Sequence, residues 1–179
     1  MKLKDTARFL LTPSTSGPKA TLAIRLMAGG VFFWEGLLKF AYANQGVGRF
    51  TKLGLPVPDV LAPAIAVLEI GGGLLLMSGL LTRLINVPFI IEMVVAMLAT
   101  KVGVFLGTSP LPRPPSPPTV GLWAVLHDIR SDYAQIMSCL FLLAAGPGPW
   151  SLDAWLAKRR QARAPLTVER DPQLDAVRA

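Results

Sequence analysis

Hydrophobic residues fall in long runs along the chain, and short polar segments separate them. The first run covers about residues 20–43, the second 59–81 and the third 84–106. A helix rises about 1.5 Å per residue, so each run is long enough to cross the hydrocarbon core of a bilayer, which is about 30 Å thick. The pattern therefore predicts three membrane-spanning helices. Only Thr82 and Arg83 separate the second run from the third, so these two helices must be antiparallel.

A shorter fourth run lies at about residues 131–147. Asp132 and Gln135 stand three positions apart near its beginning, which is typical of a capping box, and Gly146 and Pro147 end it. Because the run is short, we expect its helix to extend upstream or the bilayer to thin locally. The sequence thus predicts an all-α fold, an antiparallel up-down four-helix bundle in a membrane.

The segments outside these spans differ in character. Residues 1–19 are predicted to be a cytoplasmic N-terminal tail with one short surface helix, and residues 156–179 a basic cytoplasmic tail. Residues 107–119 contain six prolines, which favours an extended insertion outside the bilayer. Residues 120–129 are predicted to form an interfacial helix anchored by Trp123. The membrane domain therefore covers about residues 20–155.

Composition agrees with a membrane protein and excludes several kinds of functional site. Hydrophobic residues make up 52% of the chain, charged residues 16%, and the mean hydropathy is +0.49, which excludes a disordered chain and argues against a soluble domain. The single cysteine, Cys139, excludes an internal disulfide, and one histidine, His127, offers no haem or zinc ligand set. No metal site is expected.

Orientation in a membrane explains the net charge of +7 better than a nucleic-acid partner does, because the basic residues lie mainly in the two tails. Four spans place eleven Lys and Arg residues on one side and four on the other. Cytoplasmic loops carry the excess, so both termini are predicted to be cytoplasmic, in a multi-pass protein of the cytoplasmic (inner) membrane. The larger group is Lys2, Lys4, Arg8, Lys19, Arg83, Lys158, Arg159, Arg160, Arg163, Arg170 and Arg178, and the smaller is Arg49, Lys52, Arg113 and Arg130.

Ionisable residues also lie inside the spans. Each would cost roughly 2.5–3.5 kcal/mol in the middle of the bilayer, so they should face inward and pair. Their depths predict an inner pair of Arg25 with Glu92 and an outer cluster of four residues. The outer cluster consists of Glu35, Lys39, Glu69 and Lys101.

Several interpretations of these charges remain open. They can be structural ion pairs, a polar pocket for a quinone headgroup, a proton or a small anion, or contacts with charged groups of a partner subunit. Glu35 precedes Lys39 by four positions, the favourable order on a helix, which predicts that these two residues pair on either of the first two interpretations. Gly71, Gly72 and Gly73 permit another helix to approach closely.

The order of these features resembles the DoxX family of small four-helix membrane proteins. The resemblance covers about residues 20–155, and the proline-rich insertion departs from the short connection that is usual in the family. It rests on Arg25, Gly36-Leu37-Leu38-Lys39-Phe40, Gly54-Leu55-Pro56, Glu69-Ile70-Gly71-Gly72-Gly73, Gly79-Leu80-Leu81-Thr82-Arg83, Gly146-Pro147-Gly148 and Ser151-Leu152-Asp153.

The resemblance implies a small membrane subunit of a quinone-linked oxidoreductase complex, such as thiosulfate:quinone oxidoreductase. Quinone is the expected cofactor, and no covalently bound cofactor is expected. The alternative that the resemblance implies is a non-catalytic scaffold or assembly partner for soluble redox or detoxifying enzymes. The expected partners are the lipid bilayer, a partner protein subunit and quinone. The sequence leaves open whether the chain is itself an enzyme.

Arg25, Lys39, Glu69 and Arg83 match polar positions that recur in the family. On that basis and on depth, the candidate catalytic residues are Lys39, Glu69 and Glu35. In this hypothesis Lys39 meets a quinone oxygen as negative charge develops, and Glu69 delivers the proton. The candidate quinone-binding residues are Arg25, Arg83, Lys101 and Glu92.

Overall fold

The computed structural model describes residues 3–12, 15–112 and 116–163, and this part of the chain contains helices and turns but no strand. Residues 113–115 of the proline-rich insertion and 164–179 of the basic tail lie outside it, as do four of the residues counted for the orientation (Lys2, Arg113, Arg170 and Arg178). The helices are α1 (Leu3–Leu11), α2 (Thr21–Ala41), α3 (Val47–Lys52), α4 (Pro58–Ser78), α5 (Thr82–Leu106), α6 (Leu122–Asp128), α7 (Arg130–Ala145) and α8 (Leu152–Arg163).

Helices α2, α4 and α5 are long and apolar enough to cross a membrane. They fall on the first three predicted spans. The fourth predicted span falls on α7, which has only 16 residues. It begins at Arg130, one residue before the predicted start, and the separate helix α6 ends two residues before it, at Asp128. That α7 crosses the bilayer stays a prediction.

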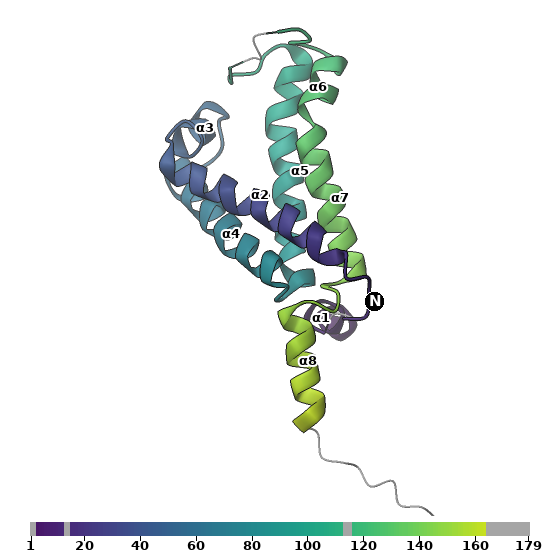
Figure 1. The fold of residues 1–179 in the computed structure, drawn as a ribbon. Coiled ribbons are helices and arrows are strands. Elements are labelled where there is room, and N and C mark those ends of the chain that lie inside the picture. The colour runs from purple at the N-terminus through teal and green to yellow at the C-terminus, as the bar shows by residue number, and fades with distance from the viewer. Residues whose placement is uncertain (1–2, 13–14, 113–115, 164–179) are drawn as a thin grey trace, which may run out of the picture.

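The long helices are arranged as two closely packed pairs, α2 with α4 and α5 with α7 (Figure 1). Helices α1 and α8 lie at one end of the molecule. The opposite end, called the far end below, carries α3, α6 and the proline-rich segment (Figure 1). The two described chain ends are therefore on the same side of the bundle.

Glycines bring α2 and α4 into contact. A methyl group on Gly73 would lie 2.6 Å from the carbonyl oxygen of Gly29, and one on Gly36 would lie 2.8 Å from that of Ala66. Gly72 faces α5, where a methyl group would lie 2.5 Å from the Phe89 ring. The predicted role of the triple glycine is confirmed for Gly72 and Gly73 but not for Gly71, whose surroundings are open.

The core where the two pairs meet combines aromatic stacking with one polar link. The rings of Phe32 on α2 and Phe89 on α5 stack with centroids 3.7 Å apart. Gln135 on α7 donates from Nε2 to the carbonyl oxygen of Ala28 on α2, at 3.1 Å. The predicted capping box is therefore wrong: Gln135 is buried between helices, and α7 begins at Arg130 with no side-chain cap.

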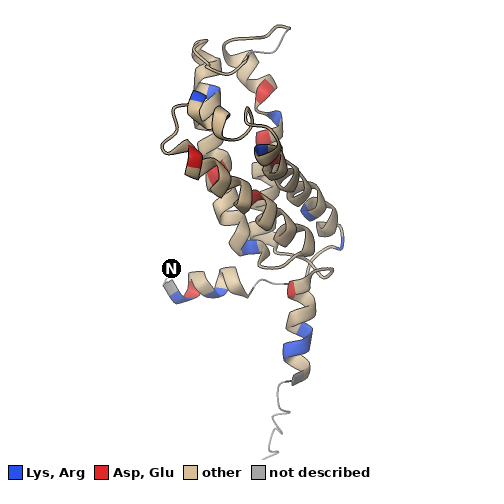
Figure 2. Cartoon of the chain, turned by 90° about the vertical axis from the view of Figure 1, so that its left-hand side faces the viewer, with Lys and Arg blue, Asp and Glu red and all other residues tan. Residues whose placement is uncertain are grey.

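Helix α1 lies crosswise at its end of the molecule, whereas α8 continues away from the bundle (Figure 2). Helix α1 is strongly amphipathic and carries Lys4 and Arg8, a pattern typical of a helix lying in the membrane interface. Blue segments, which mark Lys and Arg, recur along α1 and α8 in Figure 2. This arrangement agrees with the short surface helix predicted for the N-terminal tail.

Candidate functional site

The centre of the candidate site is an ion pair between α2 and α4. The Nζ atom of Lys39 lies 2.7 Å from Oε1 and 2.6 Å from Oε2 of Glu69. Only 13% of the Lys39 side chain and 4% of the Glu69 side chain are exposed. Both groups are thus removed from solvent and lipid, as the sequence predicted for charges inside the spans.

Glu92 approaches the same place from α5. Its carboxyl group lies close enough to that of Glu69 and to the ammonium group of Lys39 for electrostatic interaction with both. The Oε2 atom of Glu92 is buried and has no hydrogen-bond partner among the described residues. We call Lys39, Glu69 and Glu92 the central cluster.

Helix faces explain why these three residues meet. The buried residues of α2 include Phe32 and Gly36, and Lys39 follows Gly36 by three positions on the same face. In α4, Glu69 lies between buried Ala66 and Gly72 in the same way. The packing of glycine faces thus places Lys39 opposite Glu69.

Two of the predicted pairings are wrong. Glu35 is exposed on the outer face of α2, and Lys39 pairs with Glu69 instead of Glu35. Arg25 does not pair with Glu92: it is 1% exposed, donates from Nη2 to the carbonyl oxygen of Trp150 and is attracted to Asp153. The reason is that Arg25 lies at the end of α2 where α8 begins.

Lys101 also lies outside the central cluster. Its Nζ atom contacts Asp128 at 2.7 Å and Asp132 at 3.0 Å, at the junction of α6 and α7. The predicted outer cluster of four residues is therefore reduced to the pair of Lys39 and Glu69. Sequence reasoning missed both aspartates as partners of Lys101, although Asp128 and Asp132 stand only four positions apart in the chain.

Arg83 holds helices together at the end that carries α1 and α8. Its guanidinium donates to the carbonyl oxygens of Phe9 at 3.2 Å and Ala144 at 2.9 Å, and it lies 4.0 Å from the centre of the Phe9 ring. These contacts join α5 to α1 and to the end of α7. They give Arg83 a structural role.

Asp153 is a second structural residue at this end. Its carboxylate accepts hydrogen bonds from the amides of Leu81 at 3.2 Å and Thr82 at 3.4 Å, and its own amide donates to the carbonyl oxygen of Gly79. Leu81 has a positive φ of 52°, which is unfavourable for a leucine. Asp153 therefore caps α5 from another helix and stabilises a strained turn.

The described residues contain no group of three His, Cys, Asp or Glu side chains that could hold a metal ion. The central cluster offers other chemistry. Lys39 donates hydrogen bonds, and the carboxyl groups can accept them. Such a set fits an oxygen-bearing ring that gains or loses protons, since the lysine can bind a carbonyl oxygen and the free Glu92 oxygen can accept from a hydroxyl.

The fold and the buried charges define an integral membrane protein with helices able to span the bilayer. The profile of the DoxX family matches residues 20–102. The chain is 41% identical over 152 residues to "Uncharacterized membrane protein Rv3486" of Mycobacterium tuberculosis, covering 82% of this chain and 86% of that protein. The chain belongs to the DoxX family.

A second relative is "Putative oxidoreductase CatD" of Bacillus subtilis. It is 34% identical over 142 residues, which cover 79% of this chain and 90% of that protein. No solved structure matches the chain significantly. The resemblance deduced from the sequence motifs is thus confirmed at the level of the family.

Proposed function

We propose that this protein is the small membrane subunit of a quinone-linked oxidoreductase complex in the cytoplasmic membrane, with α7 as a fourth span and both termini cytoplasmic. The observation that carries the proposal is the central cluster. Ionisable side chains within membrane spans are costly, and those that persist commonly mark ion, proton or ligand sites. The name of the Bacillus subtilis relative, which includes the word oxidoreductase, supports a redox role.

The chemistry of the cluster fits this role. A quinone supplies acceptor chemistry when bound, taking up two electrons and two protons. Lys39 would donate a hydrogen bond to an oxygen where negative charge develops. Glu69 and Glu92 would hold the proton to be delivered, because two neighbouring carboxyl groups repel each other when both are ionised. Electrons would come from a partner subunit of the complex.

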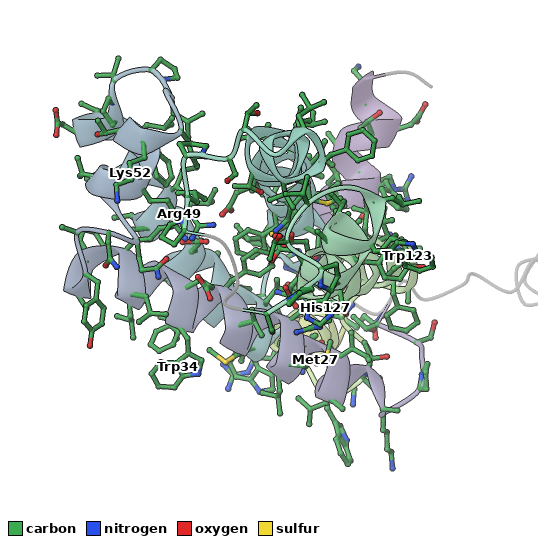
Figure 3. The ribbon with its side chains drawn as sticks, turned by 90° about the horizontal axis from the view of Figure 1, so that it is seen from above. Met27, Trp34, Arg49, Lys52, Trp123 and His127 are labelled. Atoms are coloured by element: carbon green, nitrogen blue, oxygen red, sulfur yellow. The ribbon has the colours of Figure 1, made fainter. Side chains whose placement is uncertain are left out.

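One observation favours the alternative function, a scaffold for a soluble or membrane partner. Glu35 and Trp34 are both exposed on α2, the latter by 64%. Figure 3 shows Trp34 pointing away from the other helices. A carboxylate on a lipid-facing surface has a high free energy, so a cationic group of a partner would stabilise it.

The test is the quinone-linked activity of the assembled complex in membranes that carry variants of this chain. Lys39→Met removes the charge at similar length, and Glu69→Gln removes the titratable proton. Each should lower activity by at least about 100-fold, the usual contribution of a proton-transfer group. Asp59→Asn is the control, because it makes the same chemical change at an exposed position in the first turn of α4.

The amount of folded protein in the membrane distinguishes the alternatives. If either variant disappears from the membrane while Asp59→Asn remains, Lys39 and Glu69 are structural partners. If both variants accumulate with full activity, the cluster is not the site, and the scaffold function becomes the better proposal.

A further inference from the structure

A polar cavity of about 460 Å³ opens at the far end, away from the central cluster. It lies between the segment after α2, helix α3, the last turns of α5, the proline-rich segment and α6. Asn44 and Gln45 contribute amides to its wall, and Arg49 and Lys52 contribute positive charge. Figure 3 looks onto this end and shows Arg49 and Lys52 together on α3.

Among the described residues, no carboxylate lies within salt-bridge distance of either cation of α3. Arg49 instead donates a side-chain hydrogen bond to Oε1 of Gln45 at 3.2 Å. The remaining cation of the cavity, Lys101, is already neutralised by aspartates. The cavity therefore keeps a local excess of positive charge on its α3 side.

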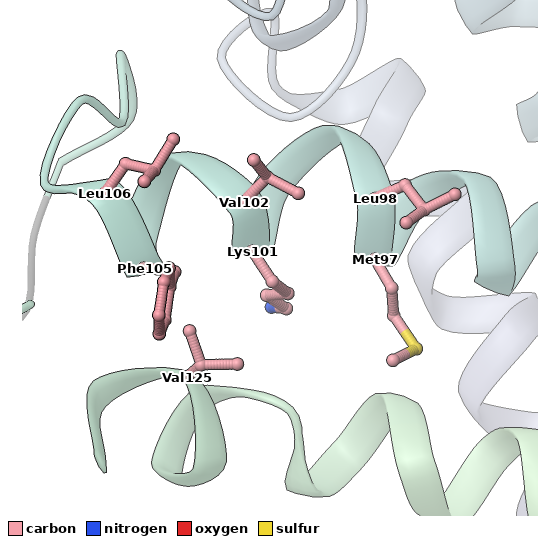
Figure 4. A pocket seen from close by; sticks show the side chains of 7 residues that line it. All are labelled: Met97, Leu98, Lys101, Val102, Phe105, Leu106 and Val125. Carbon is pink, nitrogen blue, oxygen red and sulfur yellow. The ribbon is translucent and has the colours of Figure 1, made fainter. Parts of the chain in front are cut away.

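An apolar groove shares one lining residue, Lys101, with this cavity. It has a volume of about 310 Å³ and runs along α5 and α6 (Figure 4). Leu98, Val102 and Phe105 line it from α5, and Val125 closes it from α6. In Figure 4 Phe105 points toward Val125, so the groove lies between the two helices.

Lys101 lines both the groove and the cavity. Its hydrocarbon stem lies in the groove while its ammonium group is held by Asp128 and Asp132. A ligand passing this lysine would therefore move from apolar to cationic surroundings. Both lie beside the last turns of α5, the groove along residues 97–106 and the cavity along residues 100–104, which is the depth at which lipid headgroups begin if α5 spans the bilayer.

We propose that the far end binds an anionic membrane amphiphile, with a phosphate or carboxylate headgroup in the cavity beside Arg49 and Lys52 and its chain in the groove. The amides of Asn44 and Gln45 supplement the two cations as hydrogen-bond donors. Neither α3 cation belongs to the central cluster. The proposal is thus independent of quinone chemistry.

Lipid exchange on the purified full-length protein tests the proposal. The protein in neutral detergent is mixed with equal amounts of phosphatidylglycerol and phosphatidylcholine of the same chains, and the bound lipids are counted by native mass spectrometry. The wild type should prefer phosphatidylglycerol. Each cation near an anionic lipid changes binding by about fivefold, so Arg49→Gln with Lys52→Gln should reduce the preference on the order of 25-fold.

A matched pair in α8 serves as the control. Lys158→Gln with Arg160→Gln removes the same charge from exposed positions at the opposite end. This variant should keep the preference. Equal losses in the two double variants, or an unchanged preference after both α3 cations are removed, would overturn the proposal.

A second arm separates a lipid from a free anion. Val125→Trp fills the groove and should weaken phosphatidylglycerol binding while leaving the cavity cations in place. Inorganic phosphate, titrated by calorimetry, should bind far more weakly than the lipid. Phosphate binding that depends on Arg49 and Lys52, without any lipid preference, would assign the cavity to a soluble anion and contradict the amphiphile. Size-exclusion profiles confirm that each variant is folded.

Discussion

The carboxylate of Asp153 accepts a hydrogen bond from the backbone amide of Leu81, with 3.2 Å between Oδ1 and the nitrogen, although the two residues lie 72 positions apart. Leu81 stands in the left-handed region between α4 and α5. The contact fixes the start of α5 from α8 and satisfies amide groups that a helix end leaves free. The part of the chain after α7 thus completes the turn between α4 and α5.

Replacing Asp153 by Ala should destabilise the protein by about 0.5–2 kcal/mol, the usual contribution of a helix cap. Asp153→Asn keeps one acceptor oxygen and should lose less. Thermal unfolding in detergent, followed by the loss of the monodisperse peak, measures both changes. Asp5→Ala alters an exposed carboxylate of α1 and is the control. Equal melting temperatures for Asp153→Ala and Asp5→Ala would show that the cap contributes nothing.

The triple glycine offers an internal comparison. A methyl group at Gly73 would lie 2.6 Å from the Gly29 carbonyl oxygen, so Gly73→Ala should separate α2 from α4 and destabilise the fold by about 1–3 kcal/mol. Gly71 has open surroundings, so Gly71→Ala should be neutral or stabilise the helix by up to about 1 kcal/mol. The same unfolding assay measures both variants. A reversed order of their melting temperatures would contradict the helix contact.

The two aspartates of Lys101 should be partly redundant. Asp128→Asn or Asp132→Asn alone leaves one carboxylate within 3.0 Å of the lysine, so each change should alter stability by less than about 1 kcal/mol. The double variant leaves a largely buried ammonium group without a partner and should lose more than the sum of the two single effects. Melting temperatures of the three variants test this, and strict additivity would rule out the shared ion pair.

Labelling of single cysteines tests the membrane topology. Ser109 lies at the far end and Ala162 on α8 at the opposite end, as Figure 1 shows for these segments. With cytoplasmic termini, Ser109→Cys should react with an impermeant maleimide in intact cells and Ala162→Cys should react only after lysis. The native Cys139 is buried and should give little background. The opposite labelling pattern would reverse the orientation.

The sequence by itself determined the class of this protein, because hydropathy and helix length are local properties. Three apolar runs became α2, α4 and α5 within a few residues of the predicted bounds. The spacing of the glycines also indicated which face of α2 packs against α4. Gly29, Phe32, Gly36 and Lys39 repeat every three or four positions and lie on one face of α2, whereas Glu35 precedes Gly36 and points elsewhere.

Depth alone therefore misled the pairing of charges, because it ignores rotation about the helix axis. Glu35 and Glu69 have similar predicted depths, yet only Lys39 of α2 lies on the buried face and meets Glu69. The period of the buried positions in α2 and α4 was the signal that could have selected this pair. The inward position of Glu92 could be predicted by the same reasoning, since Glu92 lies three positions after buried Phe89.

Only the tertiary structure decided the other contacts. Arg25 reaches Trp150 across 125 positions, and Lys101 reaches the α6–α7 junction across the proline-rich segment. No local period encodes such pairs, because they depend on where α8 and α6 return to the bundle. The cationic cavity at the far end has the same origin: α3, α5 and α6 each contribute part of its wall, and only their packing brings Arg49 and Lys52 into one cavity with Lys101, which also lines the apolar groove.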